Sequence, residues 1–181
     1  MSLTAENVRV AVTGAALVAP LGTTIPTDAT TAPGSTFNDT GYIHEDGVTQ
    51  AIGTEMSDIK AWQNGDVVRK IQTAHDLTFQ FTMIETTVTT LKIYYADKTA
   101  TATAVKVTAA QSEHNAWVLE VNDGDNTIRV VLPDAQVTER GDITYKTDEA
   151  IGYNITLTAY ADSDGVKAYI YLDDGATEAG A

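Results

Sequence analysis

Alternating hydrophobic and polar residues recur along the chain and predict a protein built mainly of β-strands. The clearest strand covers residues 77–84, where four apolar side chains fall on one face and three polar ones on the other. The same alternation, interrupted by turn residues, predicts further strands over residues 8–12, 104–108, 117–121, 128–132, 143–145, 153–159 and 166–172. Pro133 is expected to end the strand before it. Strands at this spacing indicate a β-sandwich or barrel.

Residues 54–75 have a mixed pattern that predicts a long β-hairpin arm. The pair Asn64-Gly65 is typical of a two-residue type I′ turn, because both central positions of that turn need positive φ. Such a turn places Trp62 opposite Val67. Neither face of this hairpin is purely apolar, so it either projects into solvent or is covered by another element.

The arm carries the candidate interaction residues. An exposed tryptophan on a projecting arm is typical of an interface anchor, whereas packing of Trp62 against its own domain is the alternative. Trp117, in contrast, lies on an alternating strand and is expected in the core. The proposed subunit interface consists of Trp62, Asn64, Gly65, Asp66 and Arg69.

Two other segments have less regular patterns. Residues 17–40 are rich in Ala, Thr, Gly and Pro and predict a long extended surface loop, a kind of loop that is often functional. Apolar residues at 84, 88, 91 and 95 have helical spacing, with Thr86 available as an N-cap. Residues 91, 93 and 95 also alternate, and the threonines favour a strand. The pattern alone leaves helix and strand open over residues 86–95.

Length and charge narrow the functional class. The 181 residues predict a single domain over residues 1–175 and a flexible tail of Gly, Ala and acid over residues 176–181. The net charge of −14 argues against ordinary binding to a phosphate backbone, which needs clustered Lys and Arg. The first residues do not resemble a signal peptide, and no apolar run approaches the ~20 residues of a membrane span. Synthesis in the cytoplasm is therefore expected.

Catalytic and metal chemistry find little support in the sequence. The chain has no cysteine, and His44, His75 and His114 are expected in separate loops. The acidic turns at residues 123–125 and 162–165 lack the ligand pattern of a calcium loop. Neither a phosphate-binding loop nor a nucleophile motif occurs. We therefore expect no enzymatic activity, no cofactor and no metal.

The order of several short motifs resembles one known family, the major tail tube proteins of siphovirus-type bacteriophages. The resemblance covers roughly residues 15–175 and is carried by Ala19-Pro20-Leu21-Gly22-Thr23, Pro26-Thr27-Asp28 and segments 41–49, 59–69 and 78–86. Each motif is weak alone, but the ordered set is specific. The resemblance implies a β-sandwich with one flanking helix, related to the tubes of contractile tails and type VI secretion. It favours a helix over residues 86–95.

The resemblance also implies an assembly. Six copies would join sheet edges into a ring, and rings would stack around a tape-measure protein into a tube that later conducts DNA. Tail terminator and distal tail or baseplate proteins would be further partners, and the mature location would be the virion tail. The arm and the long loop would be the contact elements.

A carbohydrate-binding module is the competing interpretation. A β-sandwich with exposed tyrosines at positions such as Tyr42, Tyr169 and Tyr171 can bind glycans or cell surfaces. Modules of this kind usually present an aromatic platform, whereas these aromatic residues are dispersed along the sequence.

Overall fold

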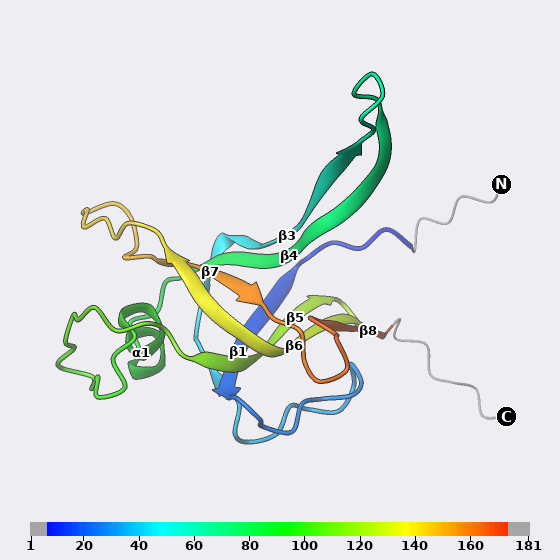
Figure 1. Ribbon diagram of the computed structural model, residues 1–181. Helices are drawn as coiled ribbons and strands as arrows, with labels where there is room; N and C mark the ends of the chain where they lie inside the picture. The colour runs from blue at the N-terminus through cyan, green and yellow to red at the C-terminus, as the bar shows by residue number, and fades with distance from the viewer. Residues whose placement is uncertain (1–6, 174–181) are drawn as a thin grey trace, which may run out of the picture.

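One antiparallel β-sheet organises the structure, a computed structural model that describes residues 7–173 (Figure 1). The strand order is β2-β1-β5-β6-β7-β4-β3, and β8 pairs separately with β6. A single helix, α1, accompanies the sheet within these residues, which confirms the mainly β prediction. The elements are β1 (Thr13–Pro20), β2 (Asn38–Asp39), β3 (Ile43–Lys60), β4 (Val67–Met83), α1 (Val88–Tyr95), β5 (His114–Asp123), β6 (Asn126–Arg140), β7 (Tyr153–Ala159) and β8 (Tyr169–Asp173). The predicted flexible tail, residues 176–181, lies outside the described residues.

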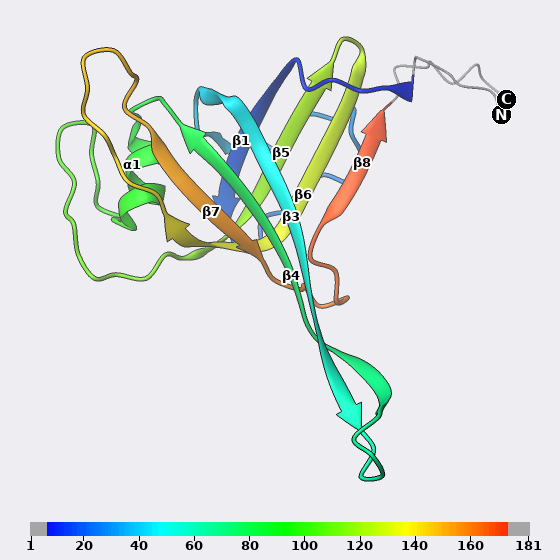
Figure 2. The same ribbon diagram turned by 90° about the horizontal axis from the view of Figure 1, so that it is seen from above.

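Strand β6 bends the sheet. One of its edges pairs with β5, while the other pairs first with β8 through residues 127–131 and then with β7 through residues 135–140. Between these two parts, Pro133 and Asp134 lie opposite the single residue Ala116, which is a β-bulge. The prediction that Pro133 ends the strand is therefore wrong. The bulge accommodates a residue without an N–H, and β7 and β8 diverge from it (Figure 2).

The main core lies between β4, β7 and the bent β5–β6 pair. The apolar face predicted for residues 77–84 is buried, as is Trp117, whose ring meets Phe81 edge to face with centroids 6.0 Å apart. Strand β7 alternates between buried and half-buried residues along its whole length. Helix α1 completes this core with Leu91 and Tyr94.

Helix α1 begins close to its expected position despite its poor helix formers. The N-cap is Thr87, one residue after the expected Thr86, and its Oγ1 accepts a hydrogen bond from the Thr90 N–H at 3.1 Å. The buried Thr90 hydroxyl donates to the Thr40 carbonyl at 3.1 Å. The threonines that lower helix propensity thus cap the helix and attach it to the sheet.

Three predicted strands do not form. Residues 8–12 run past the end of β5, where the N–H of Val12 bonds to the Asn122 carbonyl and the N–H of Val10 bonds to the Asp123 carboxylate, without a continuous ladder. Residues 104–108 lie in a loop organised by Asp97, whose carboxylate accepts the N–H of Lys106 at 2.7 Å. Residues 143–145 also lack a partner strand. Alternation predicts how a segment would pair, but a strand forms only where a neighbour is available.

The predicted loop over residues 17–40 is shorter than expected. Residues 17–20 belong to β1, and residues 38–39 form β2. The remainder folds over the other face of the sheet from the main core. There Phe37 and Ile25 pack on a second cluster that includes Val118 and Val131.

A buried arginine secures this loop. Arg129 of β6 is 4% exposed, and its Nε and Nη2 donate to the Glu120 carboxylate at 2.8 and 2.6 Å. Its Nη1 donates to the carbonyls of Asp28 and Thr31 at 2.8 and 2.6 Å. Asp28 organises the same turn, and the backbone hydrogen bond from Thr31 lowers the pKa of its carboxyl. One guanidinium therefore links β5, β6 and the loop.

We predict that Arg129→Met weakens the protein at this point. Breaking a buried pair leaves Glu120 without its counter-ion, and two loop carbonyls lose their donor. The free energy of unfolding should fall by about 3 kcal/mol. Urea unfolding measures this change, and protease cleavage within residues 21–37 should accelerate. Arg69→Met, on the exposed arm, is the matched control. If both variants were equally stable, Arg129 would not secure the loop as described.

Candidate assembly surfaces

The arm, residues 54–75, projects away from the sheet as a two-stranded ribbon (Figures 1 and 2). Every residue in 49–60 and 62–73 is exposed. Trp62 at the end of the ribbon is 98% exposed, so the alternative of packing against its own domain does not hold in the single chain. No other described part of the chain therefore covers the apolar side chains of the arm.

The tip of the arm has the expected backbone but a different pairing. Asn64 and Gly65 have φ values of 61° and 70°, as a type I′ turn requires. However, Lys60 pairs with Val67, and the Ala61 N–H bonds to the Asp66 carbonyl at 2.7 Å. The observed pairing differs from the predicted one because the register shifts at Glu55/Met56 and again at Ile59/Lys60. The predicted pairing of Trp62 with Val67 is wrong because β-bulges add residues to one strand only.

The structure brings most of the candidate interface residues together. Trp62, Asn64, Gly65 and Asp66 lie within the turn, while Arg69 lies further along β4, opposite Ile59. Their role as an interface stays a prediction. The arm also exposes aliphatic side chains that were not singled out from the sequence: Ile52 just before it, then Met56, Ile59, Val67, Val68 and Ile71.

The arm differs from the rest of the chain in charge. Residues 54–75 contain three acidic and three basic side chains, so the arm is formally neutral and the remainder carries the whole net charge of −14. Lys70 and Asp58, a cross-strand pair, form an ion pair at 3.3 Å. Two copies of the chain therefore repel each other through their bodies but not through their arms.

The strand order ends at β2 and at β3, and β8 pairs only with β6, so the described sheet has three open edges. Strand β2 has only two residues, whereas β3 and β8 offer longer and unlike edges. On β8, Ile170 and Leu172 are 50% and 73% exposed. Unpaired strand edges expose rows of backbone donors and acceptors that another strand can join.

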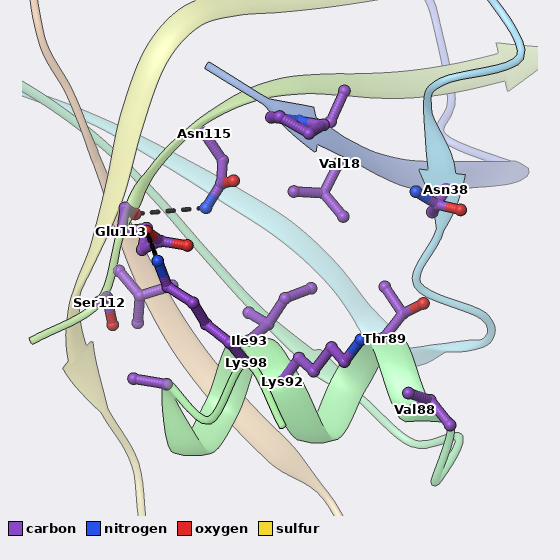
Figure 3. A pocket seen from close by; sticks show the side chains of 14 residues that line it. Val18, Asn38, Val88, Thr89, Lys92, Ile93, Lys98, Ser112, Glu113 and Asn115 are labelled. Atoms are coloured by element: carbon purple, nitrogen blue, oxygen red, sulfur yellow. Dashed lines mark hydrogen bonds and ion pairs between the residues drawn. The ribbon is translucent and has the colours of Figure 1, made fainter. Parts of the chain in front are cut away.

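A groove of about 440 Å³ lies between α1 and the adjacent ends of β1 and β5 (Figure 3). Aliphatic side chains line it, including Val18, Val88, Ile93 and Val137. Lys92 extends along the groove from α1, while Lys98 is held in an ion pair with Glu113 at the other side. Sequence reasoning missed this groove because its walls come from five separate segments.

The histidines do not form a site. All three lie in strands, not in loops as expected. His44 pairs with Asp46 at 2.9 Å, and His114 pairs with Asp134 at 2.6 Å. Within residues 7–173, no group of side chains could hold a metal ion. The same residues include no helix with the length and apolar character needed to cross a membrane.

The tyrosines of the competing interpretation have separate environments. Tyr42 is exposed beside β3, whereas Tyr169 and Tyr171 stack with rings 5° from parallel and pack on the second cluster. The Tyr169 hydroxyl donates to Asp162 at 2.8 Å, and this bond raises the pKa of Tyr169 to about 12. Asp162 also accepts the N–H of Val166 at 2.9 Å. These two stacked rings thus support the turn before β8.

We predict that Tyr169 ionises at a higher pH than a tyrosine that lacks such a bond. Its folded-state pKa of about 12 lies above the ordinary value of about 10. Its contribution to the free energy of unfolding is therefore complete below pH 10 and is lost as the pH rises through 12. Tyrosinate absorbance measures the step, which Tyr169→Phe should remove and Tyr42→Phe should retain. A step near pH 12 in Tyr169→Phe would contradict the assignment.

Comparison with known proteins gives one assignment. The family model described as phage tail tube protein matches residues 1–181 of the chain. A search of curated proteins found no match.

Proposed function

The chain belongs to the phage tail tube protein family, and we propose that it polymerises as stacked hexameric rings into the tail of a siphovirus-type phage. Membership in this family supports a structural, non-enzymatic component of the virion tail that assembles with itself. In the proposed assembly, the tube forms around a tape-measure protein and later conducts DNA during ejection. Tail terminator and baseplate proteins would close its two ends.

Two unlike sheet edges, those of β3 and β8, carry this proposal. The β3 edge of one copy would join the β8 edge of the next, because both are unpaired among the described strands. A contact between two different surfaces is heterologous. It closes into a ring when the rotation from one subunit to the next is a whole fraction of 360°. Closure would also remove the edges that otherwise promote aggregation.

The arm would join neighbouring subunits, either between stacked rings or around one ring. Its exposed apolar side chains and its neutral charge suit a contact between copies of a strongly acidic chain. The loop over residues 21–37, fixed in position by Arg129, is the second proposed contact element.

The acidic character of the chain suits a conduit for DNA. Six copies with a charge of −14 give a ring of about −84, which repels phosphate groups at close range. DNA would then pass without binding to the wall. Synthesis would take place in the host cytoplasm, before assembly into the virion.

We predict that the arm tip is required for assembly and not for folding. Deletion of residues 63–66, or Trp62→Ala, removes only exposed residues, so the thermal unfolding temperature should stay within about 2 °C. Negative-stain electron microscopy of concentrated protein should show tubes for the unaltered chain and none for either variant. Tyr145→Ala, another exposed aromatic, is the control. Tubes of normal length from the Trp62→Ala protein would contradict the role of the arm.

We also predict that salt promotes tube formation. Screening shortens the reach of the repulsion between acidic bodies, from about 10 Å at 0.1 M to about 3 Å at 1 M salt. Tube yield in electron micrographs should therefore rise over this range. The protein lacking residues 63–66 should form no tubes at any salt concentration, which separates assembly from precipitation. A yield that falls steadily with added salt would oppose this prediction.

A further inference from the structure

An exposed side chain and a groove lie far apart within one chain. The arm tip presents a fully exposed indole, whereas the groove beside α1 is a cavity of about 440 Å³. In both views of the ribbon, the arm points away from the part of the molecule that contains α1 (Figures 1 and 2). Any contact between tip and groove therefore involves two copies.

The groove has the properties of a receptor for an aromatic side chain with an acidic neighbour. Val18 lies on one wall of the groove, and Val88 and Ile93 of α1 lie on the other (Figure 3). These walls are aliphatic, and burial of a tryptophan ring against them removes apolar surface from water. Lys92 is exposed along the groove and forms no ion pair with any residue in 7–173.

The arm tip has the matching properties. Trp62 and Asp66 lie at the two ends of one tight turn, and the Ala61–Asp66 hydrogen bond fixes the width of that turn. Asp66 is exposed and makes no ion pair with the described residues. A turn of fixed geometry loses little conformational entropy when it binds, which favours its use as an insert.

We propose that the groove receives the arm tip of a second copy, with the Trp62 ring between Val18 and Ile93 and the Asp66 carboxylate beside Lys92. This contact rests on the proposed function and specifies its partner surface. Tip and groove are different surfaces, so each copy can donate its tip to one neighbour and receive the tip of another. The contact is therefore heterologous and extends along the assembly. It pairs the neutral arm with one of the few basic positions on an acidic body.

Disulfide trapping tests the position of the tip. The chain has no cysteine, so Gln63→Cys in the tip and Thr89→Cys in the groove introduce the only two thiols. Oxidation during assembly should convert most of the protein into a ladder of covalent multimers on a denaturing gel. The matched control combines Gln63→Cys with Asp125→Cys, at the opposite end of β5 from the groove, and should stay largely monomeric. Equal ladders from both pairs, or tubes without a ladder from the first pair, would overturn the contact.

Charge exchange tests the ion pair. Asp66→Lys and Lys92→Asp should each reduce tube yield by roughly tenfold, because each places like charges together. The double variant should restore most of the yield, since it re-forms the pair in the opposite sense. Circular dichroism verifies that each monomer is folded. A double variant no better than the worse single variant would overturn the ion pair, whereas unaltered protein that forms neither rings nor tubes would overturn the proposed function itself.

Discussion

Backbone hydrogen bonding along one edge of β6 governs the rest of the structure. That edge pairs first with β8 and then with β7, and the bulge at Pro133 and Asp134 separates the two pairings. Because the two partners diverge, the sheet bends around the main core and its outermost strands do not meet. The same bend that creates the core therefore leaves β3 and β8 with unpaired edges. In the proposed tube, such an unpaired edge would be a surface for the next subunit.

The main core is held together by apolar packing. On the other face of the sheet, the loop is held by a charged group, Arg129. Few large apolar residues occur in the loop over residues 21–37, and two of them, Phe37 and Ile25, pack in the second cluster on the sheet. Arg129 compensates by binding Glu120 and two loop carbonyls at once, so its buried guanidinium has partners at all three nitrogens. A buried ion pair is weak evidence for stability, but it fixes geometry. The loop consequently has one position on the sheet, as a contact element requires.

Sequence patterns predicted those features that depend on neighbouring residues. Alternation identified the buried faces of β4, β5 and β7, and Asn64-Gly65 predicted positive φ at the arm tip. Features that depend on distant segments were missed. Residues 8–12 alternate as well as any strand but do not pair with a strand along their length, and the bulges in the arm leave no local signal. Helix α1 came from family resemblance, since its threonines act through tertiary contacts. Arg129 and the groove could not be predicted, because their partners come from segments far apart in the sequence.

Charge distribution explains how one chain can be both soluble and ready to assemble. If the net charge of −14 were spread evenly, every approach between copies would be repulsive at low salt, and the apolar arm would only add a risk of aggregation. Because the arm is neutral, its approach to an acidic body carries little repulsion, while contact between two bodies stays unfavourable. The apolar surface is also confined to a narrow ribbon, so few orientations bury it. In the proposed assembly, repulsion would select against disordered aggregates, and the arm would set the orientation in which copies associate.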